Sequence, residues 1–169
     1  LWAGHLRVNW AAVLGARVTV AGPNGRRSVT LDEAFQKRFA KDEMVVVIEV
    51  DPPAARSGSS FYKYMARGVL EIPTVNTAAT VSLNADGTCN RARAAIGAVS
   101  WKPIVLDLKE LVGQRLNDDL LRKSVQGVRG AAEPVSDVRG SATYKREMAV
   151  EFAYRALAKA WQRARQNKS

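Results

Sequence analysis

Residues 134–146 read PVSDVRGSATYKR, a polar turn that opens directly into the most strongly patterned segment of the chain. Gly140 interrupts the preceding backbone, and Ser141 belongs to the residue types that cap a helix by accepting a hydrogen bond from an amide of its first turn. Apolar side chains then recur at helical spacing, at Met148, Ala149, Phe152, Ala153, Ala156, Leu157, Ala160 and Trp161. Charged side chains occupy the opposite face, at Lys145, Arg146, Glu151, Arg155, Lys159 and Arg163. The pattern predicts a long amphipathic helix from residue 142, packed on a core by one face.

The segment before this helix predicts an antiparallel sheet and two shorter helices. Strands are predicted at 61–66, 75–84 and 89–100, and the Asp86-Gly87 pair between the last two favours a hairpin. A turn or short helix is expected near 70–74. Beyond Pro103 the pattern predicts helices at 104–112 and 118–128, each ending near a glycine. Three strands followed by three helices indicate an α+β fold with helices packed on an antiparallel sheet.

The N-terminal third predicts a second, smaller unit. Residues 14–22 and 26–30 flank Pro23-Asn24-Gly25, a strong hairpin turn. Thr30 and Glu33 have the spacing of a capping box for a helix at 31–35, and the β-branched run at 44–50 predicts a strand. Small and polar residues at 54–60 predict an exposed connection. We therefore expect two domains, at residues 1–53 and 61–169.

Composition excludes several classes of protein. The 169 residues are 47% hydrophobic, enough for an ordinary core, and the net charge of +10 suggests an anionic partner. Basic residues are scattered without interleaved aromatics, so nucleic-acid binding is disfavoured. No apolar run reaches the roughly 20 residues of a membrane span. A single cysteine cannot form an internal disulfide, and the sequence favours a soluble, cytoplasmic protein. Since the first residue is Leu1, the chain is expected to be a processed product or a piece of a longer one.

The chain contains few residues that could perform chemistry. There is one histidine, His5, and one cysteine, Cys89, so neither a metal site nor a nucleophile–base pair can be assembled from them. The carboxylate pairs at 42–43 and 118–119 are expected to be solvated charges beside turns or helix starts. We predict no catalytic residue and no metal ligand, and any chemistry would come from a cofactor or another subunit.

Five phrases follow one another along the chain: VTLDEAF at 29–35, FYK at 61–63, EIPTV at 71–75, AIGAV at 95–99 and DVRGSATYKR at 137–146. In order and spacing they resemble the C-terminal part of the FAD-binding medium subunit of molybdenum hydroxylases, the xanthine dehydrogenase and carbon monoxide dehydrogenase family. The resemblance implies the end of a PCMH-type FAD subdomain, followed by a CO dehydrogenase flavoprotein C-terminal-like domain. That domain would combine a three-stranded antiparallel sheet with a three-helix bundle.

The resemblance also implies a function. Medium subunits of this family bind FAD and pass electrons to an acceptor from 2Fe–2S clusters, which are reduced by a molybdopterin centre. The iron–sulfur clusters and the molybdopterin would lie in a small and a large partner subunit. Lys63 corresponds to an FAD-contacting lysine of the family, and Val45 to an apolar segment that lines the flavin. The residues alone leave other interpretations open, because Lys63 could be a solvated strand charge and Val45 a core residue.

Two departures from the family pattern leave alternatives. The glycine-rich loops that hold the FAD pyrophosphate precede the matched region, so the chain lacks a complete FAD site. Arg7 replaces an acidic residue of the family shortly before Asn9-Trp10. Another chain could supply the missing half, the polypeptide could be a fragment, or flavin binding could be lost. In the last case the protein would be a flavin-free structural subunit that docks its partners.

Overall fold

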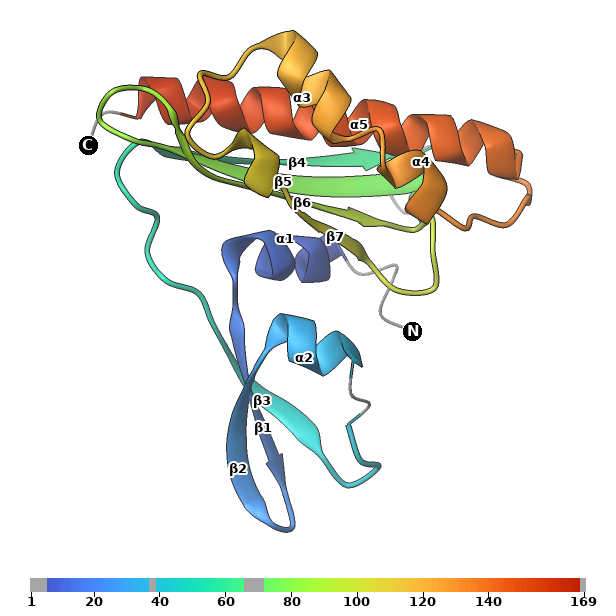
Figure 1. Cartoon of the computed structure of the whole chain (residues 1–169). Helices are drawn as coiled ribbons and strands as arrows, with labels where there is room; N and C mark the ends of the chain where they lie inside the picture. The colour runs from blue at the N-terminus through green and yellow to red at the C-terminus, as the bar shows by residue number, and fades with distance from the viewer. Residues whose placement is uncertain (1–5, 37–38, 66–71, 168–169) are drawn as a thin grey trace.

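A computed structural model describes residues 6–36, 39–65 and 72–167, which form two sheets with helices around them (Figure 1). The small sheet has the order β2-β1-β3, and the large sheet has the order β4-β5-β6-β7. All strand pairs in both sheets are antiparallel. The α+β fold class predicted from the sequence is confirmed.

The small sheet and its two helices come from the N-terminal third of the chain. The elements are α1 (Leu6–Leu14), β1 (Arg17–Gly22), β2 (Gly25–Thr30), α2 (Leu31–Gln36) and β3 (Met44–Glu49). The β1–β2 hairpin turns at Gly25, where φ is +99°, a backbone conformation that glycine adopts without strain. Helix α2 begins with the predicted capping box: the Thr30 amide donates to Glu33 at 2.8 Å, and the Glu33 amide donates to the Thr30 hydroxyl at 3.2 Å.

The large sheet is built by β4 (Ser57–Tyr64), β5 (Val75–Leu83), β6 (Cys89–Gly97) and β7 (Ile104–Asp107). Helix α5 (Ala142–Gln166) lies along one face of this sheet, as Figure 1 shows. The contact is close because the backbone of β4 approaches the helix at Gly58, where a Cβ atom would lie 2.3 Å from the Ala160 carbonyl oxygen. The Ser60 hydroxyl donates to the Ala156 carbonyl across the same interface at 2.6 Å. The short elements η1 (Lys109–Leu111), α3 (Asp118–Ser124) and α4 (Val128–Ala131) complete this layer.

Helix α1 packs on the opposite face of the large sheet (Figure 1) and joins it to the small sheet. Ala12 and Val13 of α1, Val18 and Val20 of β1, and Ala78 and Ala95 of the large sheet belong to one buried apolar cluster. Two polar contacts fix the helix on the sheet. The Asn9 amide donates to the side chain of Asn76, and the Arg93 guanidinium donates to the Ala12 carbonyl at 2.9 Å.

The structure corrects several predicted elements. Residues 104–112 are not a helix, because 104–107 pair with β6 as strand β7 and only 109–111 form a 3-10 turn. The large sheet therefore has four strands, one more than predicted. The predicted helix 118–128 ends at Ser124, and α4 follows separately. Strand β4 begins at Ser57, inside the predicted connection, and ends at Tyr64. Helix α1 was not predicted. Of the turn or short helix predicted near 70–74, residues 72–74 form a bend and no helix, and residues 70–71 lie outside the described residues.

Candidate functional site

Lys63 lies near the end of β4, on the face of the large sheet that carries α1. Its strand neighbours Tyr62 and Tyr64 face α5, where both contact the ring of Phe152. Phe61 faces the other way and stacks on Trp10 of α1, with ring centroids 6.2 Å apart. Because side chains alternate along a strand, Lys63 shares the face of Phe61. The side chain is half-buried, a position from which an ammonium group can reach a ligand at the sheet surface.

Two buried polar atoms lie beside Lys63 without a partner among the described residues. Asn76 is the register partner of Lys63 on β5, and its Nδ2 atom makes no hydrogen bond although the residue is 1% exposed. Thr74 is also 1% exposed, and its Oγ1 atom is equally unsatisfied. Leaving such a group buried and unpaired costs about 1–3 kcal/mol. These atoms are therefore suited to a polar ligand. In the sequence Thr74 and Asn76 are only polar residues on either side of Val75, and no local pattern marks their side chains as buried.

Val45 belongs to the other sheet. It lies on β3, opposite Val20 of β1, and packs against the apolar cluster that joins α1 to both sheets. Phe61, two residues before Lys63, packs against the same cluster. The fold thus places Val45 and the Lys63 strand around one shared apolar cluster, although it shows no contact between the two residues. Arg7 is the second residue of α1, but its side chain lies outside the described part of the structure, as does all of His5.

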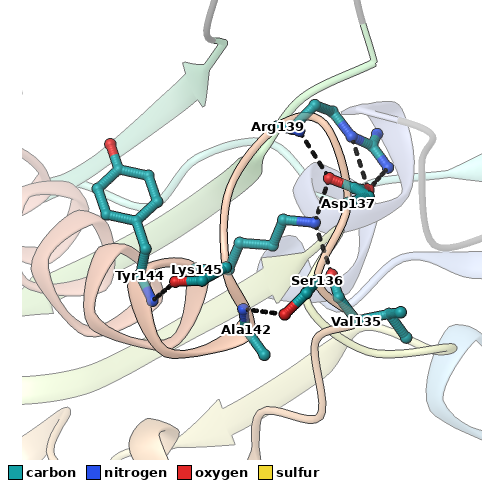
Figure 2. A network of polar contacts seen from close by, with 8 residues as sticks. Val135, Ser136, Asp137, Arg139, Ala142, Tyr144 and Lys145 are labelled. Atoms are coloured by element: carbon teal, nitrogen blue, oxygen red, sulfur yellow. Dashed lines mark hydrogen bonds and ion pairs between the residues drawn. The ribbon is translucent and has the colours of Figure 1, made fainter.

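A second polar cluster precedes α5 (Figure 2). The Asp137 carboxylate accepts hydrogen bonds from the Arg139 amide and guanidinium, at 2.8 and 3.0 Å, and pairs with the Lys145 ammonium at 2.7 Å. Lys145 also donates to the Val135 carbonyl at 2.7 Å. The Arg139 guanidinium and then Lys145 hold the pKa of Asp137 well below its usual range. Lys145 was predicted on the charged, solvent-facing side of the helix and is instead 3% exposed.

This cluster shapes the start of the long helix. Ser141 caps α5 as predicted, since its hydroxyl accepts from the Tyr144 amide at 3.1 Å. The Ser136 hydroxyl accepts from the Ala142 amide at 2.8 Å, so two of the first helical amides are satisfied by the turn. The Tyr144 hydroxyl in turn lies 2.6 Å from the Tyr64 hydroxyl at the end of β4. The cluster therefore connects the turn to the Lys63 strand, and its own carboxylate is fully occupied by cations.

Chemistry beyond binding has little support in these side chains. Among the described residues, no group of histidine, cysteine, aspartate and glutamate side chains is arranged to hold a metal ion. Burial raises the pKa of the Cys89 thiol to about 11, which keeps it protonated near neutral pH. None of the helices in this part of the chain combines the length and the hydrophobicity of a membrane span. The unsatisfied atoms of Thr74 and Asn76 leave hydrogen-bonding capacity for a polar ligand beside Lys63.

Comparison with solved structures first defines the class. The fold superposes on a carbon monoxide dehydrogenase from Hydrogenophaga pseudoflava with a TM-score of 0.87 and 27% sequence identity, over 96% of this chain and 58% of that chain. Residues 60–160 match the family model of the CO dehydrogenase flavoprotein C-terminal domain. The chain belongs to this family, and the resemblance predicted from its sequence is confirmed.

Similar sequences support the same family membership. The chain is 31% identical to the carbon monoxide dehydrogenase medium chain of Hydrogenophaga pseudoflava, over 88% of this chain and 53% of the relative. It is 30% identical to the glyceraldehyde dehydrogenase medium chain of Sulfolobus acidocaldarius, over 80% and 49%, and 27% identical to the nicotinate dehydrogenase FAD-subunit of Eubacterium barkeri, over 83% and 50%. The chain thus spans about half the length of the curated relatives it matches.

Proposed function

We propose that this chain forms one wall of an FAD site in a molybdenum hydroxylase-type oxidoreductase and takes part in electron transfer through the flavin. The observation that carries the proposal is the pair of buried, unsatisfied polar atoms of Thr74 and Asn76 beside Lys63, in a member of a flavoprotein family. Partners would be a molybdenum-binding large subunit and an iron–sulfur small subunit. The complex would operate in the cytoplasm.

The residues around Lys63 fit part of a flavin. Bound FAD would accept and release electrons, which is the chemistry that the side chains lack. The Lys63 ammonium would balance the negative charge of a reduced ring or of a phosphate. The Asn76 amide would donate to a ring carbonyl or nitrogen, and the Thr74 hydroxyl can donate or accept. Val45 would supply an apolar contact from the small sheet.

The pyrophosphate of FAD requires a second half of the site. The family's glycine-rich phosphate loops lie upstream of the matched region, and we propose that upstream sequence or another chain supplies them. The small sheet offers a surface for that half. Met44, Val47 and Ile48 of the outer strand β3 are 67%, 43% and 57% exposed, although such side chains are usually covered. A strand or helix packed there would cover them and place phosphate loops near Val45.

A second candidate function is a flavin-free subunit that only docks the large and small partners. It is favoured by Arg7, which stands where the family carries an acidic residue, and by the absence of the phosphate loops from the matched region. Under this alternative Lys63 is a solvated strand charge. The Thr74 and Asn76 atoms would then be satisfied by water or by a partner chain.

Flavin analysis of the intact complex tests the proposal. The chain is purified with its natural partners, and the released flavin is identified and quantified. We expect FAD near one equivalent per chain, a substoichiometric amount in the Lys63→Gln variant, and full occupancy in Lys123→Gln. Lys123 is a matched control, because it is an exposed lysine on α3 and removes the same charge. An intact complex that contains molybdenum and iron–sulfur clusters but no flavin contradicts the proposal and leaves the docking subunit.

A further inference from the structure

A pocket of about 480 Å³ lies at the other end of the large sheet from Lys63. It opens where β4 begins and β5 ends, at the Ser57–Ser82 end of their pairing, whereas Lys63 pairs with Asn76 at the opposite end. Its lining includes Arg56, Leu83, Arg115, Leu116, Trp161 and Arg165. The volume is in the range of sites that hold small metabolites. The pocket is separate from the proposed flavin wall.

The charged residues that line this pocket are all cationic. Among the described residues, three arginines contribute to the lining and no aspartate or glutamate does. Asp86 lies in the neighbouring turn, and one of its carboxylate oxygens accepts from both the Thr88 hydroxyl and the Thr88 amide, at 2.7 and 2.9 Å. Hydrogen bonding by Thr88 is also the main cause that lowers the pKa of Asp86, and the charge of Arg115 is a minor one. Arginine is the side chain best suited to phosphate, because its planar fork donates two parallel hydrogen bonds.

The three arginines come from different parts of the chain. Arg165 lies in the last turn of α5, where any cation is favoured by the helix dipole, and its guanidinium lies 5.3 Å from the Trp161 ring centroid. The dipole does not account for Arg56, which precedes β4, or for Arg115, which follows η1. Convergence of three such segments on one pocket is what a built anion site requires.

Arg56 adopts a strained backbone conformation at the pocket. Its φ is +52°, in the left-handed region that disfavours side chains with a Cβ atom. The conformation is held in place because the Leu83 amide donates to the Arg56 carbonyl at 3.0 Å. Glycine would adopt this turn without strain, yet an arginine occupies it and contributes to the lining. Strain of this kind is concentrated at functional sites.

We propose that this pocket binds a small phosphorylated anion of nucleotide size. The phosphates would contact Arg56, Arg115 and Arg165, and the remainder of the ligand would lie on the apolar surface of Trp161, Leu83 and Leu116. This site does not depend on the proposed flavin function. The competing explanation is that an acidic side chain of a partner subunit fills the pocket, in which case no phosphate would bind there in the complex.

Isothermal titration calorimetry of the full chain, in its complex, tests the proposal with ADP, pyrophosphate and adenosine as probes. We expect saturable binding of ADP, weaker binding of pyrophosphate and none of adenosine. Arg115→Gln and Arg165→Gln should each weaken ADP binding by about tenfold, the loss expected for one charge-assisted hydrogen bond. Arg26→Gln is the matched control, because it removes the same charge from an exposed position on β2.

Arg56→Gly separates binding from folding. It removes the guanidinium and also relieves the backbone strain, so we expect weaker ADP binding with an unchanged or higher melting temperature. No saturable binding of ADP or pyrophosphate overturns the proposal. ADP binding of equal strength in Arg115→Gln and Arg26→Gln overturns it as well, because the nucleotide would then occupy another site of the complex.

Discussion

The two sheets differ in how their faces are covered. The large sheet lies between α5 and α1, and its central strands β5 and β6 are buried along most of their length. The small sheet buries Val18 and Val20 of β1 on one side only, and its edge strand β3 exposes an apolar run. An exposed apolar edge invites pairing with another segment. Most of the free energy of folding is therefore expected to come from the large sheet, whereas the small sheet leaves β3 open to a further strand or helix.

Gly58→Ala should disrupt the contact between the large sheet and α5, and it should lower the stability of the fold more than any other substitution proposed here. The new Cβ atom would lie 2.3 Å from the Ala160 carbonyl oxygen and 2.4 Å from the Ala164 amide nitrogen, both backbone atoms that no rotamer change can move. We expect a loss of more than about 3 kcal/mol in the free energy of unfolding, or failure to fold. Urea unfolding measures it. Gly127→Ala, where no atom lies within 4 Å of the new Cβ, is the control and should be neutral.

One substitution in the core of the large sheet and one on the edge of the small sheet compare how much each sheet contributes to stability. Leu157 of α5 is fully buried, and Leu157→Ala should cost about 2–5 kcal/mol. Ile48 of β3 is 57% exposed, and Ile48→Ala should stay within about 0.5 kcal/mol of wild type. Denaturant unfolding of both variants at several protein concentrations is the measurement. An equally large, concentration-dependent loss for Ile48→Ala would show that β3 is already covered by another copy.

Asp137→Asn should have an intermediate effect that depends on pH. The pKa of Asp137 is lowered in the folded protein by Arg139 and then by Lys145, so its carboxylate stabilises the fold above the unfolded pKa, near 4. That stabilisation is lost as the pH falls further. We expect Asp137→Asn to lower the melting temperature at pH 7 and to approach wild type as the pH falls below 4. Asp42→Asn, at an exposed loop position, is the control and should leave the melting temperature at pH 7 near that of wild type.

Arg27→Gln in the small sheet should have the smallest effect. Arg27 pairs with Glu43 through two hydrogen bonds of 2.9 and 3.0 Å, but the pair lies at the surface and is screened by salt. We expect a change in melting temperature at the limit of detection at physiological salt. A clear loss that persists in high salt would mean that the small sheet depends on this pair and is held more tightly than its exposure suggests.

Local signals predicted much of the fold. The hairpins, the Thr30–Glu33 capping box and the Ser141 cap depend on residues a few positions apart, and all three are present. The prediction of a helix at 104–112 was wrong because the apolar spacing of this segment is compatible with a helix or a strand. Pairing with β6 makes residues 104–107 a strand. The burial of Lys145 was missed for a similar reason, since only the folded turn brings Asp137 to its ammonium.

The candidate site was less accessible from the sequence. Lys63 and Val45 were identified through a family resemblance, and their roles stay predictions. Thr74 and Asn76 could be recognised only when the sheet showed that their polar atoms are buried without partners. The arginine pocket could not be predicted from the sequence either, because Arg56, Arg115 and Arg165 are far apart along the chain and form no sequence motif. Convergence of distant segments is a property of the fold and leaves no local pattern.

The contact between β4 and α5 affects how the protein can fold during its synthesis on the ribosome. Ser60 and Ala156, which share a hydrogen bond, are 96 residues apart, and Ser57 and Asn167 are 110 apart. The inner face of β4 therefore stays uncovered until the 96 to 110 residues that follow it have been synthesised. During that interval its tyrosines and the bare backbone at Gly58 are open to chaperones and to other nascent chains. Completion of this core must wait until α5 has left the ribosome.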